Sequence, residues 1–373
     1  MKGRIVLLGG GHSHVEVLRR FGRAPVAGVE LVLVSPNRWT PYSGMLPGLV
    51  AGHYTFEDTH IDLERVARYA GARFLPTIAT GLDPAASTVT LADGATLAFD
   101  LVSLDVGSTS ATAGIPGASA HTLGVKPVDA FLRAWDALIE QAGVGALKRA
   151  VVVGGGAAGV ELTLGMQHRI AAATGRRDAV EWQLVTDVDV LLPAHNEKVR
   201  RIFRRILTER EIEVHLSSRV ARVEPGAVFA ANGYRVAGDV ILWATGAAAS
   251  PRFAASGLAV DDRGFIAVDE TLRSVSHPNV FATGDCATMV GHPRPKSGVY
   301  AVRQGPPLAE NLRAAAEGRP LARYIPQARS LALISTGDRY AVASRDGWAF
   351  EGGWVWRWKD WIDRRFMRRY AAL

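Results

Sequence analysis

The stretch of sequence that determines the fold is AVVVGGGAAGVE, residues 150–161. Four apolar residues lead into a full match to the pattern G-x-G-x-x-G, formed by Gly154, Gly156 and Gly159, and a helical pattern follows. In a strand–turn–helix of this kind the glycines allow a tight turn and let the backbone approach a dinucleotide pyrophosphate. The stretch therefore predicts a Rossmann-like nucleotide-binding unit.

A similar stretch, RIVLLGGGHSH, lies at residues 4–14. Its apolar run leads into Gly9 and Gly11, whereas His14 stands at the third glycine position. Taken alone, this stretch is equally typical of an ordinary strand–turn–helix. Two such fingerprints in one chain favour two nucleotide-binding units over two unrelated glycine turns, with phosphates resting on the N–H groups where each helix begins.

The end of the second strand in such a unit usually carries an acid that contacts the adenosine ribose. In the first unit this position is Ser35, which hydrogen-bonds a ribose less strongly than a carboxylate does. In the second unit the strand at 182–187 ends at Asp187. No arginine follows immediately to receive a 2′-phosphate, which favours NADH over NADPH, although Arg176 and Arg177 could fold back toward the site.

The closing strands of the two units echo each other. Residues 100–107 and 239–246 both begin with aspartate and end with glycine, at Gly107 and Gly246. With the paired fingerprints, this echo indicates an approximate internal duplication of nucleotide-binding modules, in which the sequence similarity is only coarse.

A further motif follows the second unit. Residues 280–282 form a short buried strand that is terminated by Gly284 and Asp285. An acid at a strand end, beside the start of a helix, can accept hydrogen bonds from the sugar-like hydroxyls of a cofactor. The stretch at 295–304 opens a helix, whose N-terminus carries a partial positive charge and free N–H groups.

The composition is that of a globular protein with an acidic partner. The chain has 373 residues, of which 48% are hydrophobic and 21% charged, so we expect roughly two or three domains. The net charge is +7 and the pI about 9.7, which suits nucleotide phosphates or an anionic membrane surface. The sequence has no zinc-ligand spacing and no basic strand motif interleaved with aromatics, so we do not expect nucleic-acid binding.

Features that the sequence lacks also limit the location and the reaction mechanisms that we expect. No apolar run approaches the roughly 20 residues that cross a bilayer, and the chain begins directly with a strand, so we expect no signal peptide and a cytoplasmic location. Cys286 is the single cysteine. An internal disulfide, a two-cysteine redox centre and a multi-cysteine metal site are therefore excluded, and we expect no metal.

In their order, the two fingerprints, the stretch ATG at 244–246 and the stretch TGD at 283–285 resemble the FAD-dependent pyridine nucleotide–disulfide oxidoreductase superfamily. Within it, the chain looks most like type II NADH dehydrogenases (NADH:quinone oxidoreductases) and their relatives. The sequences HSH at 12–14 and TPYSGMLPG at 40–48 look still more like the flavoprotein module fused to selenophosphate synthetase. A loop such as 39–48, rich in proline, glycine and large apolar residues, is more typical of a segment packed on a cofactor than of a surface turn.

The resemblance implies an α/β fold with two Rossmann-like domains. The FAD domain would comprise residues 1–118 and 248–320, and the NAD(P)H domain, residues 119–247, would be inserted between them. A small C-terminal region, 321–373, would end in an amphipathic helix.

The resemblance also implies the site residues and their roles. Glu161 would lie between nicotinamide and flavin; as an ordinary alternative it is a helix-cap carboxylate. Lys296 and the helix start near it would stabilise negative charge on reduced flavin. The residues implied to bind FAD or NADH are Gly9, Gly11, His14, Ser35, Gly107, Gly284, Asp285, Val299, Gly154, Gly156, Gly159, Asp187 and Gly246.

The resemblance implies an FAD-dependent NAD(P)H dehydrogenase. Disulfide members of the superfamily carry two cysteines in the loop matching 41–46, and this loop has none, so electrons must pass to an external acceptor. A quinone is favoured, although the glutamines of type II enzymes are replaced here by Val299 and Arg303. The alternatives are a soluble diaphorase with another acceptor and a redox-responsive accessory flavoprotein, linked by the fusion to selenium metabolism.

The C-terminal stretch 354–373 carries a possible membrane contact. At helical spacing, Val355, Trp358, Ile362, Phe366 and Tyr370 align, with Lys359, Arg364 and Arg368 largely elsewhere. Tryptophan and arginine together suit a helix lying in a bilayer interface, which predicts a peripheral position on the inner face of the membrane. The alternatives are a helix packed on its own core or on a second copy in a homodimer.

Overall fold

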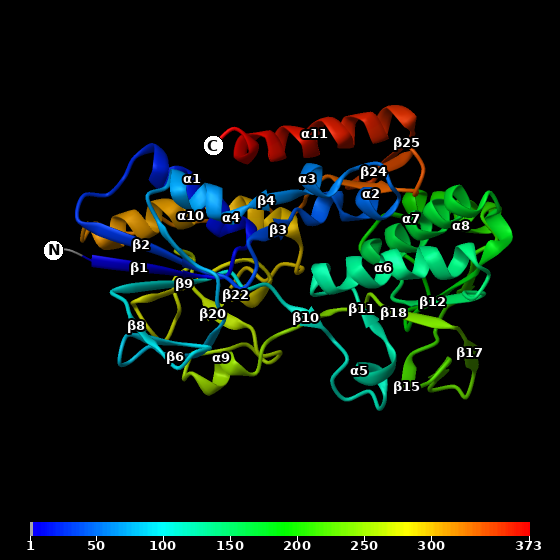
Figure 1. Cartoon of the computed structure of the whole chain (residues 1–373), viewed down its shortest axis with the longest axis horizontal. Coiled ribbons are helices and arrows are strands. Elements are labelled where there is room, and N and C mark those ends of the chain that lie inside the picture. The colour runs from blue at the N-terminus through cyan, green and yellow to red at the C-terminus, as the bar shows by residue number, and fades with distance from the viewer. Residues whose placement is uncertain (1–2) are drawn as a thin grey trace.

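Two parallel sheets of five strands form the centres of two units that lie side by side along the long axis of the molecule (Figure 1). The computed structural model describes residues 3–373. The sheet of the first unit has the order β21-β9-β1-β2-β5 and that of the second β11-β18-β12-β13-β14. Because β21 follows the second sheet in the chain yet pairs with β9, the second unit is inserted into the first. The predicted α/β fold of two Rossmann-like units is confirmed.

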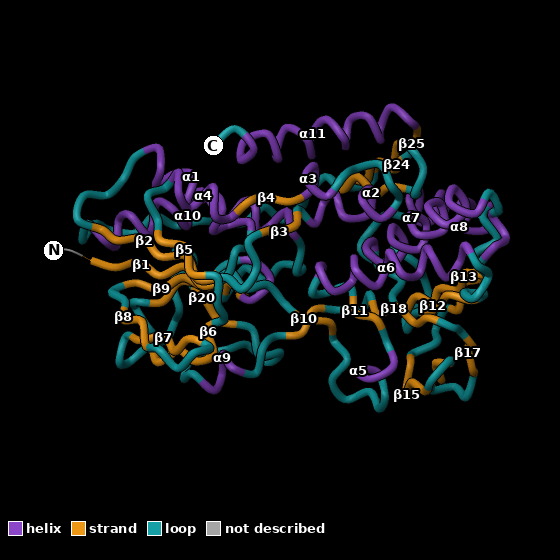
Figure 2. The backbone as a smooth tube through the Cα atoms, viewed as in Figure 1, coloured by secondary structure: helices purple, strands orange, loops and turns teal. Residues whose placement is uncertain are grey.

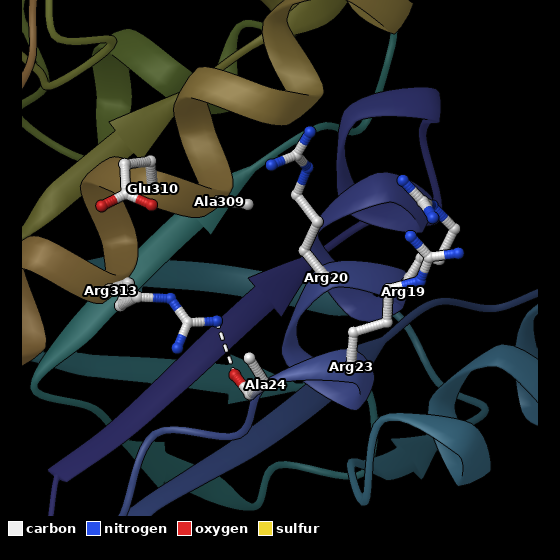
Figure 3. A pocket seen from close by; sticks show the side chains of 7 residues that line it. All are labelled: Arg19, Arg20, Arg23, Ala24, Ala309, Glu310 and Arg313. Carbon is white, nitrogen blue, oxygen red and sulfur yellow. Dashed lines mark hydrogen bonds between the residues drawn. The ribbon is translucent and has the colours of Figure 1, made fainter.

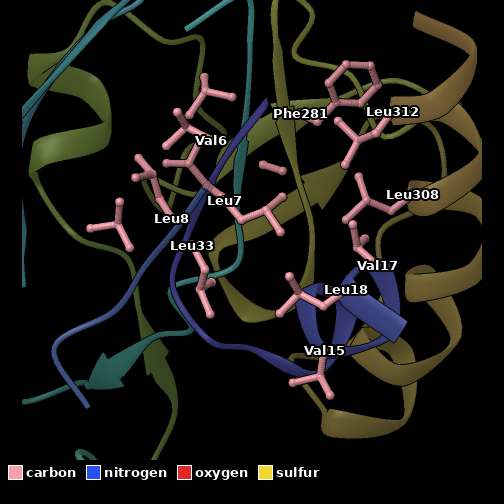
Figure 4. Packing of buried hydrophobic residues seen from close by; sticks show 14 of the residues in the cluster. Val6, Leu7, Leu8, Val15, Val17, Leu18, Leu33, Phe281, Leu308 and Leu312 are labelled. Atoms are coloured by element: carbon pink, nitrogen blue, oxygen red, sulfur yellow. The ribbon is translucent and has the colours of Figure 1, made fainter. Parts of the chain in front are cut away.

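The first sheet is buried on both faces, as parallel sheets usually are. Val6 and Leu7 of β1 have no exposed surface, and side chains of α1 and α10 cover one face (Figure 4). The elements are β1 (Gly3–Leu8), α1 (His12–Arg23), β2 (Val29–Val34), α4 (Leu63–Tyr69), β5 (Arg73–Leu75), β9 (Leu101–Leu104), β21 (Val280–Ala282) and α10 (Gly298–Ala316).

The second unit repeats this plan with its own helices. Its elements are β11 (Leu123–Gly124), α6 (Val128–Gly143), β12 (Arg149–Val153), α7 (Ala157–Thr174), β13 (Glu181–Val185), α8 (Glu197–Glu209), β14 (Glu213–His215) and β18 (Val240–Trp243). The predicted duplication extends to hydrogen bonds. The Asp100 carboxylate accepts the Arg4 N–H at 2.6 Å, and the Asp239 carboxylate accepts the Arg149 N–H at 2.9 Å.

Each unit carries a three-stranded antiparallel sheet, and the chain crossings between the units pair with each other (Figure 2). β7 and β8 pair in antiparallel fashion and form a hairpin around Asp93. The antiparallel sheets are β6 (Ala79–Asp83), β7 (Thr88–Leu91) and β8 (Thr96–Ala98), and β15 (Val220–Glu224), β16 (Ala227–Ala230) and β17 (Arg235–Ala237). The paired crossings are β10 (Thr109–Ser110) and β19 (Ala247–Ala248).

The segment at 39–48 is ordered and largely packed. β3 (Trp39–Pro41) pairs with β4 (His60–Asp62), and α2 (Leu46–Val50) follows a short turn in which Met45 is buried. The remaining short elements are α3 (Phe56–Thr59), α5 (Ala118–His121), α9 (Arg252–Ala255), β20 (Ile266–Val268) and β22 (Ala287–Met289).

The C-terminal region lies across both units. A sheet of β23 (Ala332–Ser335), β24 (Ala341–Arg345) and β25 (Trp348–Gly352) stands beside the second unit, and α11 (Gly353–Ala371) runs back over the first (Figure 1). None of the helices within residues 3–373 has the length and apolar character needed to cross a bilayer.

The face of α11 that packs inward differs from the predicted stripe. Val355, Phe366 and Tyr370 are buried as that stripe requires, but Trp358 is 37% exposed. Lys359, expected on the polar side, is buried. The physical reason is that Lys359 finds polar partners inside, so the inward face includes charged residues that a hydrophobic pattern cannot identify.

Candidate functional site

A cavity of about 680 Å³ runs along the carboxyl ends of the first sheet. It follows the glycine turn after β1, the end of β2 and the segment after β9, which is where parallel α/β sheets bind ligands. Of the residues predicted to bind cofactors, five line this cavity: Gly9, Gly11, Ser35, Gly107 and Asp285. Thr40, Pro41 and Ser43 also line it, which agrees with packing of that segment on a cofactor.

The cavity has the features that a dinucleotide needs. The backbone of the glycine turn borders it directly, and Gly9 has a φ of 91°, a conformation that favours glycine. Opposite the turn, the Lys126 ammonium donates to the Asp285 carboxylate at 2.7 Å and to the Ser108 hydroxyl at 3.0 Å. The glycine turn, the Lys126 ammonium and the Asp285 carboxylate therefore fit a ligand that combines phosphates with sugar hydroxyls. Sequence reasoning missed Lys126, which no motif marks.

Asp105 is the second residue of this cavity that the motifs did not identify. Its side chain is 3% exposed and follows β9 directly. Its carboxylate accepts the Ser13 N–H at 2.8 Å and the His14 N–H at 3.3 Å, so it caps the start of α1. Burial raises the pKa of Asp105 to about 7. A charged residue at the end of an otherwise apolar strand was the available signal.

His14 lies behind the turn and does not line the cavity. Its Nδ1 lies 2.6 Å from the Gly9 carbonyl oxygen and its Nε2 lies 2.8 Å from the Ser103 hydroxyl. Burial lowers the pKa of His14 to about 4, so the ring is neutral at pH 7. In this position it braces the turn against β9.

Lys296 and Gly284 border a small pocket next to the main cavity. The Lys296 ammonium donates to the Thr288 hydroxyl at 2.9 Å and to the carbonyl oxygen of Ala287, and it lies 3.9 Å from the centre of the Phe265 ring. Burial lowers the pKa of Lys296 to about 8. Val299, in the first turn of α10, lines neither the cavity nor this pocket.

The thiol of Cys286 is fully buried beside this pocket. It donates to the Thr283 carbonyl oxygen at 3.1 Å, and burial raises its pKa to about 12. A thiol in this state is a poor nucleophile, because the thiolate is the reactive form.

The glycine turn of the second unit is open. A side chain at Gly156 would meet nothing within 4 Å, whereas one at Gly159 would overlap the carbonyl oxygen of Gly154. Asp187 is exposed just beyond β13, and Gly246 has a φ of 42° after β18. Gly156 thus leaves room for a ligand, and Gly159 lets α7 pack closely on the turn.

Glu161 is half-buried in the first turns of α7 and contacts the C-terminal region. Its carboxylate accepts the Ser335 N–H at 2.7 Å and the Ser335 hydroxyl at 3.0 Å. Burial raises the pKa of Glu161, an effect that the Lys359 charge opposes. The alternative of a simple helix cap does not describe these contacts, since both donors belong to β23.

Lys359 joins α11 to the segment at 39–48. Its ammonium donates to the Asp363 carboxylate at 2.6 Å and to the Gly44 carbonyl oxygen at 2.5 Å. Tyr42 stacks on Phe366 with ring centres 4.4 Å apart, and burial raises the pKa of Tyr42. The cluster of Glu161, Lys359, Asp363 and Tyr42 brings four titratable groups together from three parts of the chain.

A separate basic pocket of about 320 Å³ lies between α1 and α10 (Figure 3). Arg19 and Arg20 both donate to the Glu16 carboxylate, at 2.8 and 2.7 Å, and Arg313 donates to the Ala24 carbonyl oxygen at 2.6 Å. These arginines serve contacts within the first unit, and we assign the pocket no ligand.

The fold, the two glycine turns and the cavity define a protein with two dinucleotide-binding units. The chain belongs to the pyridine nucleotide-disulphide oxidoreductase family, whose model matches residues 3–305. This family assignment confirms the predicted superfamily and, with it, FAD and NADH as the cofactors.

The named relatives of the chain are distant from it in sequence. An NADH dehydrogenase-like protein of Mycobacterium tuberculosis is 29% identical over 61% of this chain and 58% of its own length. Type II NADH:quinone oxidoreductase of Haemophilus influenzae is 29% identical over 46% and 41%, respectively. The chain thus spans about half the length of these relatives. Demethylphylloquinone reductase NdbB of Synechocystis is 27% identical over 90% of this chain and 85% of that protein.

Solved structures share the fold across the whole chain. The sulfide:quinone oxidoreductase of Aquifex aeolicus has a TM-score of 0.81 at 18% identity, covering 99% of this chain and 91% of that one. NDH2 of Plasmodium falciparum, solved with NADH, has a TM-score of 0.79 at 15% identity, covering 99% and 98%.

Proposed function

We propose that the protein is an FAD-dependent NADH dehydrogenase that passes electrons to a quinone at a membrane surface. The observation that carries the proposal is the pair of dinucleotide units in a chain whose single thiol, Cys286, is buried and protonated. Without a second cysteine to form a disulfide, electrons that enter from NADH must leave to an external acceptor.

The motifs divide the chain into three parts with different roles. Residues 1–118 and 248–320 bind FAD, residues 119–247 bind NADH, and residues 321–373 support the acceptor site. FAD supplies the chemistry of accepting hydride and releasing electrons. The protein positions the two nucleotides, with Gly156 admitting the NADH pyrophosphate and Asp285 holding cofactor hydroxyls.

The buried cluster around Lys359 supports a quinone acceptor. Reduction of a quinone to a quinol consumes two protons as well as two electrons. Glu161 and Asp363 have pKa values raised by burial, and each is close enough to Lys359 for its charge to oppose that rise. These residues can hold protons near the junction of the two units. The names of two relatives, an NADH:quinone oxidoreductase and a demethylphylloquinone reductase, point to the same acceptor class.

An exposed aromatic strip supports attachment to a membrane. Four rings form it along β25 and the outer face of α11, with neighbouring ring centres 5.9 Å apart for Trp348–Phe350, 6.2 Å for Phe350–Trp354 and 6.5 Å for Trp354–Trp358. Trp361 is 51% exposed and extends the strip. Exposed basic residues Arg357, Arg365, Arg368 and Arg369 flank it. Aromatic rings with flanking arginines suit an anionic bilayer interface on the cytoplasmic side.

The activity is tested by following the flavin spectrum during turnover. NADH should bleach the flavin of the purified protein, and a short-chain soluble quinone should restore its absorbance repeatedly while NADH is consumed. Ferricyanide, which accepts electrons without protons, serves as the control acceptor. Protein that is reduced once by NADH and then stalls with quinone, but not with ferricyanide, would contradict the quinone assignment and favour another acceptor.

Membrane attachment is tested without disturbing the core. The triple variant W354S/W358S/W361S should lose binding to vesicles of mixed phosphatidylcholine and phosphatidylglycerol, because it removes apolar surface that salt does not screen. Y234S removes a ring that is 50% exposed on the second unit and is the matched control. Equal vesicle binding by both variants would exclude α11 as the attachment surface.

A further inference from the structure

The carboxyl group of Asp105 occupies a position that the second unit leaves uncharged. A side chain at Gly9 would contact the Asp105 carbonyl oxygen, and one at Gly154 would contact the Ala244 carbonyl oxygen, so Asp105 and Ala244 are equivalent residues of the two units. Asp105 borders the cavity, although its side chain is only 3% exposed. The first unit therefore has an acid at the turn where we place the FAD pyrophosphate.

The two oxygens of this carboxyl group have different environments. Oδ2 accepts the N–H groups of Ser13 and His14 at 2.8 and 3.3 Å. Oδ1 accepts no hydrogen bond from any residue in the described range 3–373. It lies between Gly11 and Gly284, because a side chain on either glycine would overlap the carboxyl group. Oδ1 is thus a nearly buried polar atom, without a partner, at the wall of the cavity.

The surrounding charges do not neutralise an ionised Asp105. Asp285 is a second acid, and its charge raises the pKa of Asp105 further. The Lys126 ammonium is already paired with Asp285. From α1, His12 and His14 are neutral at pH 7, since burial lowers both pKa values to about 4. The nearby Cys286 thiol is protonated, and the Lys296 ammonium donates a hydrogen bond to Thr288 of β22.

A bound pyrophosphate would add two negative charges beside this carboxyl group. Water screens the repulsion between solvated charges, but it does not screen like charges in a buried site. These repel strongly, so one group must give up its charge or be displaced. A diphosphate diester is a strong acid and keeps its charge at neutral pH. The carboxyl group is the one that can take up a proton, and burial has already raised its pKa to about 7.

We propose that Asp105 binds FAD as a neutral carboxylic acid whose O–H donates to the pyrophosphate, so that FAD binding takes up a proton. This inference rests on the proposed FAD site. In the complex, Oδ2 keeps its two backbone donors while Oδ1 carries the proton. The acid group then acts as a donor at a turn where glycines provide only backbone N–H groups.

The direction of the pH effect follows from this protonation. Below pH 7 the free protein already carries the proton, and FAD affinity does not depend on it. Above pH 7 the proton must be taken from solution, so FAD affinity should fall by about tenfold per pH unit until the pKa of the complex is reached. Asp105→Asn keeps a carbonyl oxygen for Ser13 and presents an N–H₂ donor without titrating, so its affinity should be independent of pH.

The experiment uses apoprotein titrated with FAD, followed by quenching of flavin fluorescence from about pH 6 to about pH 9. Wild type should show the loss of affinity above pH 7, and D105N should not. K296Q is the control, since Lys296 has a pKa of about 8 and would otherwise titrate in the same range. A pH dependence that persists in D105N and disappears in K296Q would overturn the proposal.

A second measurement needs no variant. The heat of FAD binding near pH 7.5, compared in two buffers with different ionisation enthalpies, counts the protons taken up. We expect roughly 0.8 proton per FAD from a group with a free pKa of about 7. Binding without proton uptake overturns the role of Asp105 and leaves the FAD site intact, whereas failure to bind FAD at any pH overturns the site itself.

Discussion

The two nucleotide-binding units share one backbone plan and differ in what fills the glycine turn. In the second unit the space beside Gly156 is empty and the residue closing the turn is Ala244. In the first unit the equivalent space is taken by the Asp105 carboxyl group, and His14 braces the turn from behind. An open turn suits a nucleotide that enters and leaves at every turnover, and a turn packed with buried polar groups suits one that is retained.

The difference teaches that one fingerprint can serve exchange or retention, depending on residues outside it. The glycines set only the path of the backbone. The residue after the closing strand and the residue in place of the third glycine determine how tightly that backbone is held, and both can be changed separately.

The largest effect should come from the third glycine of the second unit. In Gly159→Val the new side chain overlaps the Gly154 carbonyl oxygen, so the turn must open and α7 must move. We expect a loss of about 3 kcal/mol of unfolding free energy, measured by urea denaturation, together with loss of flavin reduction by NADH. Ala158→Val, at an exposed position of the same helix, is the control and should denature near the wild-type midpoint.

The acid sensitivity of the first unit should depend on His14. Its pKa is lowered from 6.5 to about 4, so the unfolded chain binds the proton first as the pH falls. Stability that is fully present above pH 6.5 is lost progressively down to pH 4, by about 3 kcal/mol for one histidine. His14→Gln cannot titrate, so its deficit relative to wild type should shrink on acidification.

Urea denaturation of the wild type and of His14→Gln, at neutral and at acid pH, tests this prediction. His121 is exposed, and His121→Gln is the matched control. A His14→Gln deficit that is constant with pH would mean that the ring titrates freely, and the brace inferred for the first turn would be wrong.

A more local effect is expected at the second glycine. In Gly156→Val the side chain enters open space, so the fold and the bound FAD should be unchanged while NADH binds at least about tenfold more weakly, a difference of about 1.4 kcal/mol. The same change at Gly11 should damage the fold, because it overlaps Asp105. Stopped-flow reduction at increasing NADH gives the affinity. Equal behaviour of the two variants would remove the contrast between the units.

The smallest effect should come from the thiol. In Cys286→Ser the hydroxyl can still donate to the Thr283 carbonyl oxygen, and steady-state NADH oxidation should stay within about twofold of wild type. Complete loss of turnover in protein that keeps its flavin would indicate chemistry at the thiol and contradict the external-acceptor reading.

The sequence predicted what repeats along the chain. Apolar runs ending in glycine identified the strands and the duplication, because a buried parallel strand and a tight turn each impose a local composition. The sequence did not reveal the role of Asp105, because a single acid after an apolar strand forms no repeating pattern. The partners of Asp105 lie on α1, far away in the sequence. The partner of Glu161 is Ser335, a residue distant in sequence, and only tertiary packing brings them together.

The inward face of α11 escaped prediction for the same physical reason. A hydrophobic stripe is visible in sequence, but Lys359 and Asp363 are both charged residues, and they can be buried only because they form an ion pair. Motifs in turns are therefore easier to predict than the contacts that long-range packing adds around them.

The C-terminal region has a consequence for how such a protein can evolve. The Tyr370 hydroxyl donates to Glu16 of the first unit at 3.1 Å, and Glu351 accepts Arg205 of the second unit at 2.5 Å. The region therefore contacts both units at the same time. A lineage that exchanged its inserted unit for a foreign one would lose the contact to Glu351 unless the new unit supplied a partner for it, so we expect exchange at the chain crossings to require matching changes in the C-terminal region.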